Sequence, residues 1–124
     1  MKNFLRSIIR DNMASIQYDK LIRDNIPDII EKSGKSAVVE TLDLENYAKK
    51  LSEKLQEEVG EFLVEFDNEN DEEAVKELAD IVEVVYAILD MIGVDKDAFE
   101  KIRQAKVLKN GAFNKRLLLK EVIE

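Results

Sequence analysis

Two long stretches of the chain carry apolar residues at the spacing of an amphipathic helix. Between Leu44 and Phe66, apolar side chains recur every three or four residues, and Asp43 is a suitable N-cap. Between Asp71 and Ile92 the same spacing begins, but the second half is apolar on nearly every face. A helix of that kind is buried in a bundle or in an interface between copies. The pattern therefore predicts two long helices, the second of them largely enclosed.

The short segment between these helices predicts how they pack. Residues 67–70 read Asp-Asn-Glu-Asn, and Asn70 with Glu73 has the spacing of a capping box. Helices joined by so short a turn pack antiparallel as a hairpin. We expect an all-α fold, an antiparallel helical bundle built on these two long helices. We also expect the apolar flank at residues 82–92 to pack against a second copy, in a homodimer or homotetramer.

Shorter elements flank the expected hairpin. The pattern predicts a helix over residues 25–33, where Pro lies in the first turn and Gly follows the end, and another over residues 95–109. Residues 37–39 are expected to be extended, and residues 3–12 to form a short helix. The pattern at residues 113–123 does not decide between strand and helix.

Length and composition describe one soluble globular domain. The chain has 124 residues, of which 45 % are apolar and 37 % are charged. We expect residues 1–17 to be an N-terminal extension and residues 18–124 to form the domain. No apolar run approaches the roughly 20 residues of a membrane span, and charged residues interrupt the N-terminus too early for a good signal peptide. These features favour a cytoplasmic protein that binds no membrane.

The chain contains no cysteine and no histidine. Their absence excludes disulfides, Cys/His zinc sites, histidine general bases and the Ser-His and Cys-His nucleophile pairs. It also excludes the ferritin-like di-iron site, which requires Glu-x-x-His pairs. Any bound metal must be held by oxygen ligands, which favours Mg²⁺, Mn²⁺ or Ca²⁺.

The charges are unevenly distributed along the chain. The net charge of −8 argues against general nucleic-acid binding. Residues 53–97 contain 16 acids and three bases, whereas residues 101–120 contain seven bases and no acid. This division suits a metal–phosphate ligand, because the metal requires carboxylates and the phosphates require cations. Two solvated helix faces would give the same pattern, and charge runs usually face solvent.

Each of the two long helices places a pair of acids at the edge of its apolar arc. Glu58 and Glu61 form one pair, and Glu77 and Asp80 form the other. In an antiparallel hairpin the two pairs can face each other. Four carboxylates without a matching base would repel one another, and a hard divalent cation would remove that repulsion. The alternative is that all four are ordinary exposed acids, and periodicity alone leaves the two interpretations level.

The acid pairs also belong to a familiar signature. Residues 57–61 read EEVGE and residues 77–80 read ELAD, which resembles the EExxE…ExxD signature of the MazG-type all-α nucleotide pyrophosphohydrolases. Residues 20–27 resemble the KLVRDKIP opening of the phosphoribosyl-ATP pyrophosphohydrolase-like branch. Residues 54–58 are similar to its KLxEE segment.

A fourth block extends the resemblance to about residues 18–119. Lys106 followed by residues 111–116 resembles the K…GGFxxR close of the same branch. Asn25 stands where Lys is common, and Ala112 where a second Gly is common. These differences leave the acid signature intact and affect only expected substrate contacts.

The resemblance implies an activity and the residues that carry it. It implies Mg²⁺, with Mn²⁺ as a substitute, on Glu58, Glu61, Glu77 and Asp80, and hydrolysis between the α and β phosphates to a monophosphate and pyrophosphate. The expected catalytic residues are Glu58 and Glu57, the latter orienting or deprotonating the attacking water. The expected phosphate contacts are Lys20, Arg23, Lys54, Arg103, Lys106, Lys115 and Arg116. Each of these bases also fits an ordinary surface charge. Lys54 also fits an ion pair with Glu58, one turn further along the helix.

Three functions remain open at this point. The preferred one is a nucleotide-pool enzyme that removes excess or non-standard NTPs or dNTPs, because the opening motif marks a branch and not a substrate. The second is phosphoribosyl-ATP hydrolysis in histidine biosynthesis. The third is a non-catalytic acidic helical module that binds a partner, for which the complete set of four acids would be unnecessary.

Overall fold

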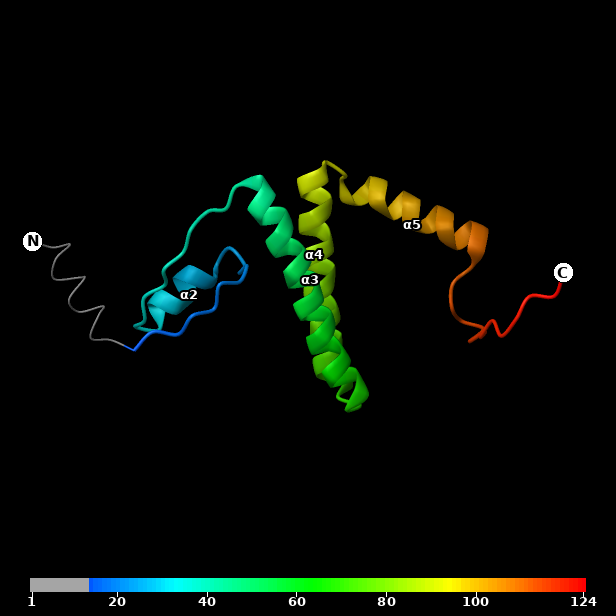
Figure 1. Cartoon of the computed structure of the whole chain (residues 1–124), viewed down its shortest axis with the longest axis horizontal. Helices are drawn as coiled ribbons and strands as arrows, with labels where there is room; N and C mark the ends of the chain where they lie inside the picture. The colour runs from blue at the N-terminus through cyan, green and yellow to red at the C-terminus, as the bar shows by residue number, and fades with distance from the viewer. Residues whose placement is uncertain (1–13) are drawn as a thin grey trace, which may run out of the picture. The chain divides into compact units, whose positions relative to one another are not determined.

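The computed structural model of the chain describes residues 14–124 in two units, one ending at Leu42 and one from Asp43 to Glu124. These residues form four helices and no strand (Figure 1), which confirms the all-α prediction. The short helix expected at residues 3–12 lies outside the described residues. No helix within residues 14–124 has the length and apolar composition that a membrane crossing requires. The expected domain boundary after residue 17 stays a prediction.

The described part of the first unit, residues 14–42, contains one helix, α2 (Ile26–Lys32), where the sequence predicts one. Pro27 lies in its first turn, where the missing N–H costs no hydrogen bond. The helix ends at Ser33, whose Oγ donates a hydrogen bond to the carbonyl of Ile30 (2.6 Å), and Gly34 follows with φ 88°. That left-handed conformation suits glycine and turns the chain out of the helix. The extended residues 37–39 pair with no strand among the described residues and form a connector.

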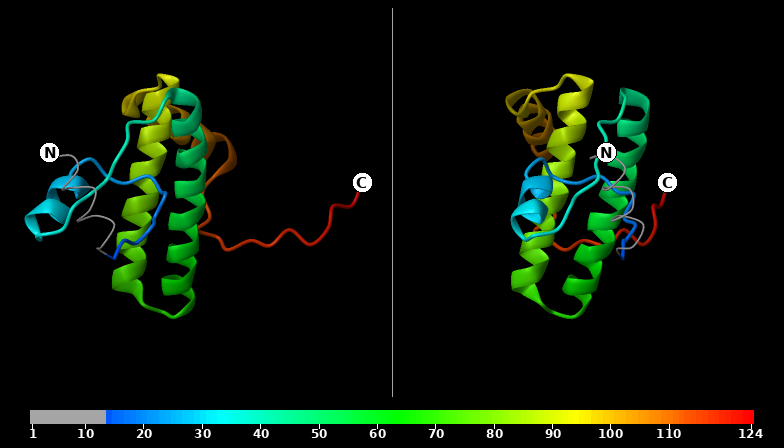
Figure 2. Two further views of the ribbon diagram at one scale, coloured as in Figure 1. Left: turned by 60° about the vertical axis from the view of Figure 1, so that its left-hand side comes forward. Right: turned by 90° about the vertical axis from the view of Figure 1, so that its left-hand side faces the viewer.

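The second unit is built on the long helices α3 (Leu44–Asp67) and α4 (Asp71–Ile92), as the hydrophobic pattern predicts. The Asp43 side chain caps α3 by accepting a hydrogen bond from the backbone N–H of Asn46 (2.8 Å). The two helices lie side by side and antiparallel (Figures 1 and 2). The predicted hairpin is therefore confirmed.

The turn between the two helices differs from the expected capping box. Asn70 makes no side-chain hydrogen bond to the backbone of α4. Its amide nitrogen Nδ2 donates instead to the Glu65 carboxylate (2.8 Å), and its backbone N–H donates to the Glu65 carbonyl (2.9 Å). The prediction was wrong because the Asn70 side chain is used to close the end of α3 and is not available to begin α4.

The core of the described residues is thin. Its buried apolar side chains are Leu51 on α3 and Ala74 and Val84 on α4, which are 2 %, 4 % and 7 % exposed. All three lie along the seam where the two helices meet. The α4 segment that was expected to be largely enclosed is only half-buried at most positions, and Val82 is 45 % exposed. A single hairpin cannot cover a helix on all sides, so full enclosure requires further packing.

The seam separates an acidic side of the hairpin from an apolar side. At 3.6 residues per turn, Glu61 and Val59 fall on opposite sides of Glu58, and Asp80 and Leu78 fall on opposite sides of Glu77. Because the acids of the two helices come together, the apolar positions also share one side. This apolar side comprises Val59, Leu63, Phe66, Val75, Leu78 and Val82, which are 38–64 % exposed.

Helix α5 (Lys96–Asn110) follows α4 after a short connection. Gly93 ends α4 with φ 82°, and Asp95 caps α5 by accepting a hydrogen bond from the N–H of Ala98 (2.8 Å). The helix contacts α4 but not α3, and every residue from 101 to 110 is exposed. Residues 111–124 form neither a helix nor a strand, which answers the question that the pattern at 113–123 left open.

Candidate metal centre

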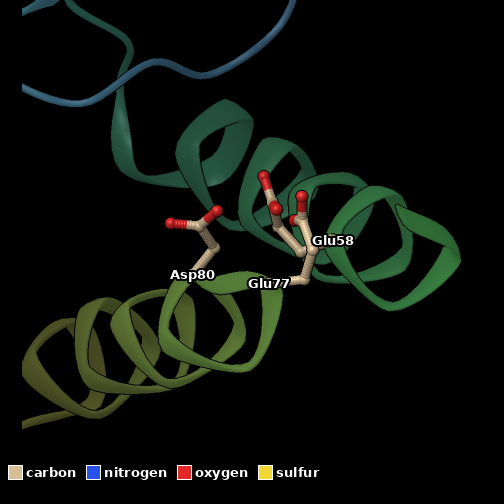
Figure 3. Close-up of side chains that lie close together, drawn as sticks. All are labelled: Glu58, Glu77 and Asp80. Atoms are coloured by element: carbon tan, nitrogen blue, oxygen red, sulfur yellow. The ribbon is translucent and has the colours of Figure 1, made fainter. Parts of the chain in front are cut away.

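Three carboxylates from the two long helices meet on the acidic side of the hairpin. Glu58 comes from α3, and Glu77 and Asp80 come from α4 (Figure 3). One oxygen from each of the three lies within 4.8 Å of the other two. The helices bring them together because Glu77 and Asp80 are one turn apart on α4, which runs antiparallel to α3 at the level of Glu58.

Two oxygens of this cluster are buried and lack any hydrogen-bond donor. Glu58 is only 6 % exposed, and its Oε2 has no partner. The Oε2 of Glu77 is also buried and has no hydrogen-bond partner. A buried carboxylate oxygen without a donor is costly, at roughly 1–3 kcal/mol for each unsatisfied group. A cation coordinated by these oxygens would remove that cost, so the residues present fit a metal site.

One base, Lys54, lies beside the acids of the cluster. The Nζ of Lys54 is 3.3 Å from Oε1 of Glu58 and 3.5 Å from Oε1 of Glu57. Lys54 is one turn before Glu58 on α3, so its side chain runs along the helix to both acids. The ion-pair interpretation of Lys54 is therefore the one seen in the structure. A single ammonium still leaves the cluster with excess negative charge.

The pKa of Glu77 is raised from its usual range to about 7. Burial is the first cause, since it disfavours the charged carboxylate, and the neighbouring charge of Glu61 and the contacts with Glu61 and Glu58 are the next. The pKa of Glu61 is also raised, by burial of its carboxyl group and then by the charge of Glu58. Glu61 is exposed, so solvent weakens the effect there. The raised pKa values show that burial and the repulsion between neighbouring carboxylates disfavour the charged form of these groups.

The size of the cluster bears on the cation it would take. Mg²⁺ binds oxygens at about 2.0–2.1 Å, so two ligands on opposite sides of the ion lie roughly 4.2 Å apart. Ca²⁺, at about 2.3–2.6 Å, spans roughly 4.6–5.2 Å. The carboxylate oxygens lie within 4.8 Å of one another. This upper limit is compatible with either ion, so the spacing of the oxygens does not separate Mg²⁺ from Ca²⁺.

The fourth expected ligand, Glu61, is adjacent to the cluster but does not belong to it. Its carboxyl group is near those of Glu58 and Glu77, which influence its pKa, yet it is not within the 4.8 Å group. Glu57, the expected base for the water, lies on the same side of α3 and is half-buried. The structure thus brings three of the four expected ligands together, and their roles stay a prediction.

The expected phosphate contacts are distributed over the chain. Lys20 and Arg23 belong to the first unit, where the Lys20 ammonium lies 5.7 Å from the centre of the Tyr18 ring. Arg103 donates from Nε to Glu100 on its own helix (2.9 Å). The remaining three, Lys106, Lys115 and Arg116, are exposed. Of the five that belong to the second unit, Lys54 lies beside the carboxylate cluster.

Sequence reasoning missed one contact near the end of α4. The Lys96 ammonium lies over the Tyr86 ring, 4.3 Å from its centre, and so links the first residue of α5 to α4. The two residues are ten positions apart and separated by a turn. Helical periodicity therefore contains no signal that could have predicted the pair.

Comparison with known proteins gives one match. Residues 17–106 match the phosphoribosyl-ATP pyrophosphohydrolase family. A search of curated proteins and a search of solved structures gave no match. The matched region includes α2, both helices of the hairpin and most of α5. Since the match covers well over half of the chain, the chain belongs to the phosphoribosyl-ATP pyrophosphohydrolase family, a branch of the MazG-like all-α pyrophosphohydrolases.

Proposed function

We propose that this protein is a Mg²⁺-dependent pyrophosphohydrolase that cleaves the bond between the α and β phosphates of a nucleotide 5′-triphosphate. Membership of a pyrophosphohydrolase family supports the reaction class. The observation that carries the proposal is the cluster of Glu58, Glu77 and Asp80, with two buried oxygens that lack a donor. A metal–triphosphate complex would supply the cation that these buried oxygens lack.

The residues in and beside the cluster would have different roles in such a reaction. Glu58, Glu77 and Asp80 would hold the cation, and Glu61 is close enough to join them after a side-chain rotation. When bound, Mg²⁺ would polarise the phosphate oxygens and make the attacking water more acidic. Glu57 lies on the acidic side of α3, with its carboxylate 3.5 Å from the Lys54 ammonium. This position suits a residue that orients or deprotonates the water.

Two substrates fit this chemistry. The first is a nucleoside triphosphate or dNTP, which would make the protein a nucleotide-pool enzyme. The second is phosphoribosyl-ATP, and the family description favours it specifically. Both carry a 5′-triphosphate, and both would release pyrophosphate from the same bond. The acidic cluster would contact only the metal and, through it, the phosphates. It therefore does not discriminate between the two substrates.

Pyrophosphate release from a panel of NTPs, dNTPs and phosphoribosyl-ATP, with and without Mg²⁺, tests the proposal. Metal-dependent release from at least one member is expected, and the ratio of kcat/KM values identifies the substrate. Mn²⁺ is expected to replace Mg²⁺, because it accepts the same oxygen ligands. If the folded protein released no pyrophosphate from any member, a non-catalytic acidic binding module would be the better explanation.

The proposal includes a homodimer or homotetramer acting in the cytoplasm. The thin core and the apolar side of the hairpin support it, since Phe66 is 58 % and Val75 64 % exposed. Exposed apolar residues gathered on one side of a hairpin are typical of an interface between copies. Light scattering of the full chain provides the test, and a single species near 14.3 kDa would contradict the oligomer.

A further inference from the structure

Lys54 lies beside two consecutive carboxylates of α3. Its Nζ is 3.3 Å from Oε1 of Glu58 and 3.5 Å from Oε1 of Glu57. The side chains of Lys54 and Glu58 are only 18 % and 8 % exposed. Charges that are shielded from water interact more strongly than charges on the surface. The Lys54 ammonium therefore acts on any ion that binds at Glu58.

Lys54 contacts Glu58 without using all of its carboxylate. The ammonium lies beside Oε1, whereas Oε2 is buried and has no hydrogen-bond partner. A cation can bind Oε2 without displacing the lysine. The cation and the ammonium would then share one carboxylate group, with two positive charges close together.

The positive charge of Lys54 acts in opposite directions on the two forms in which the metal can arrive. Free Mg²⁺ is a cation, so Lys54 repels it and weakens its binding. The Mg²⁺ complex of a nucleoside triphosphate has a net negative charge, and its phosphate oxygens accept hydrogen bonds from an ammonium. Lys54 therefore strengthens the binding of that complex. A site made of carboxylates alone would do the reverse, since it attracts free Mg²⁺ and repels the negatively charged complex.

We propose that Lys54 couples the metal to the nucleotide, because it disfavours Mg²⁺ alone at Glu58 and favours Mg²⁺ that arrives with the phosphates. Lys54 then determines the specificity of the site for the Mg²⁺–nucleotide complex over the free ion. The inference rests on the proposed function for the identity of the nucleotide. The repulsion of free Mg²⁺ depends only on the position of Lys54 beside Glu58.

Lys54→Gln tests the coupling by binding measurements that need no turnover. Calorimetric titration gives the Kd of Mg²⁺ alone and the Kd of the preformed Mg²⁺ complexes of α,β-methylene nucleoside triphosphates, in which the bond to be cleaved is replaced. We expect the variant to bind Mg²⁺ alone about tenfold more tightly and the complex about tenfold more weakly, which is within the usual range of coupling between two ligands. Changes in the same direction, or no change in either Kd, would overturn the proposal.

The matched control is Lys49→Gln, which removes the same charge from the same helix. Lys49 pairs with Glu45 at 3.9 Å, and the two side chains are 67 % and 84 % exposed. Both dissociation constants should stay within about twofold of the wild-type values, because solvent screens an exposed charge. Equal effects of the two substitutions would show that the position of Lys54 beside Glu58 is not the cause.

A chemical rescue provides the test if Lys54→Gln does not fold. The chain contains no cysteine, so Lys54→Cys can be alkylated at that position alone. Treatment with 2-bromoethylamine restores an ammonium on a side chain of nearly the same length as lysine, whereas iodoacetamide leaves a neutral side chain. The aminoethylated protein should match wild type in both Kd values. Identical affinities of the two alkylated proteins would refute the coupling.

The same titrations distinguish failure of this inference from failure of the proposed function. If the folded wild-type protein bound neither Mg²⁺ nor any of the complexes, the proposed function would fail, and this inference with it. If wild type bound and hydrolysed nucleotides but Lys54→Gln left both Kd values unchanged, the coupling alone would fail.

Discussion

The Lys54 ammonium lies 3.3 Å from Oε1 of Glu58, while Oε2 of the same carboxylate is buried and has no partner. One oxygen of Glu58 is thus held by a base on its own helix, and the other is buried without a donor. The arrangement explains how a nearly buried acid is tolerated in a cluster of acids. It also leaves one buried oxygen of Glu58 available to a cation without a competing donor.

Replacing Lys54 should lower the stability of the folded protein most when no metal is present. Lys54→Gln removes the positive charge beside Glu58, and the two side chains are only 18 % and 8 % exposed. We expect the free energy of unfolding of the metal-free protein to fall by about 1–2 kcal/mol, since a partly buried carboxylate loses its partner. Saturating Mg²⁺ should restore most of the loss. Denaturant unfolding with EDTA and with Mg²⁺ measures both values.

A suitable control for this change is Lys49→Gln. Lys49 also pairs one turn along α3, with Glu45 at 3.9 Å, but both side chains are mostly exposed. Its replacement should change stability by less than about 0.5 kcal/mol, with or without metal. Equal losses in the two variants would show that the position of Lys54 in the acidic cluster has no special effect.

Neutralising a ligand of the cluster should abolish metal-dependent turnover. Glu58→Gln and Asp80→Asn each remove a charged oxygen ligand, and a loss of about 3 kcal/mol in transition-state stabilisation lowers kcat/KM by roughly 100-fold or more. Helix content should be unchanged, because the substitutions preserve side-chain shape. Initial rates of pyrophosphate release and circular dichroism check both expectations.

Glu83→Gln serves as the comparison for these variants. Glu83 is on α4, one turn beyond Asp80, and is exposed outside the carboxylate cluster. It should retain wild-type activity. Unchanged turnover in Asp80→Asn would remove Asp80 from the site.

The raised pKa of Glu77 predicts that the metal-free protein loses stability as pH rises. The folded protein holds this proton up to about pH 7, whereas the unfolded chain releases it near the usual carboxyl pKa of 4.5. Between these values the folded state binds more protons, so the free energy of unfolding falls with rising pH and the penalty is complete above pH 7. We expect a difference of about 1–2 kcal/mol between pH 5 and pH 8. Thermal unfolding in EDTA measures it, and Glu77→Gln should reduce the slope.

Metal binding should show the opposite dependence on pH. A cation requires the Glu77 carboxylate without its proton, so affinity should fall as pH drops below about 7, and binding should release a proton near pH 6. Calorimetric titration with Mg²⁺ in two buffers of different ionisation enthalpy measures the released proton. Binding that is equally tight at pH 6 and pH 8 would argue against Glu77 as a ligand.

The hairpin was predictable because its signals are local. Helical periodicity, the Asp43 cap and Gly93 act within a few residues, and each lies where the sequence indicates. The turn at Asn70 was not predictable in detail, since two hydrogen-bonding uses of one side chain compete and the packing of Glu65 decides between them. The Lys54–Glu58 ion pair was among the predicted alternatives, because helix spacing allows it.

The sequence by itself determined the helices, the acid pairs at their apolar edges and the separation of acidic from basic residues, because spacing along one helix settles which side chains share a face. Only the tertiary structure decided that Glu58, Glu77 and Asp80 approach within 4.8 Å while Glu61 remains beside them. Only the tertiary structure showed that α5 contacts α4 but not α3. The reason is that both facts depend on the register and the angle between packed helices, and no local pattern encodes either quantity.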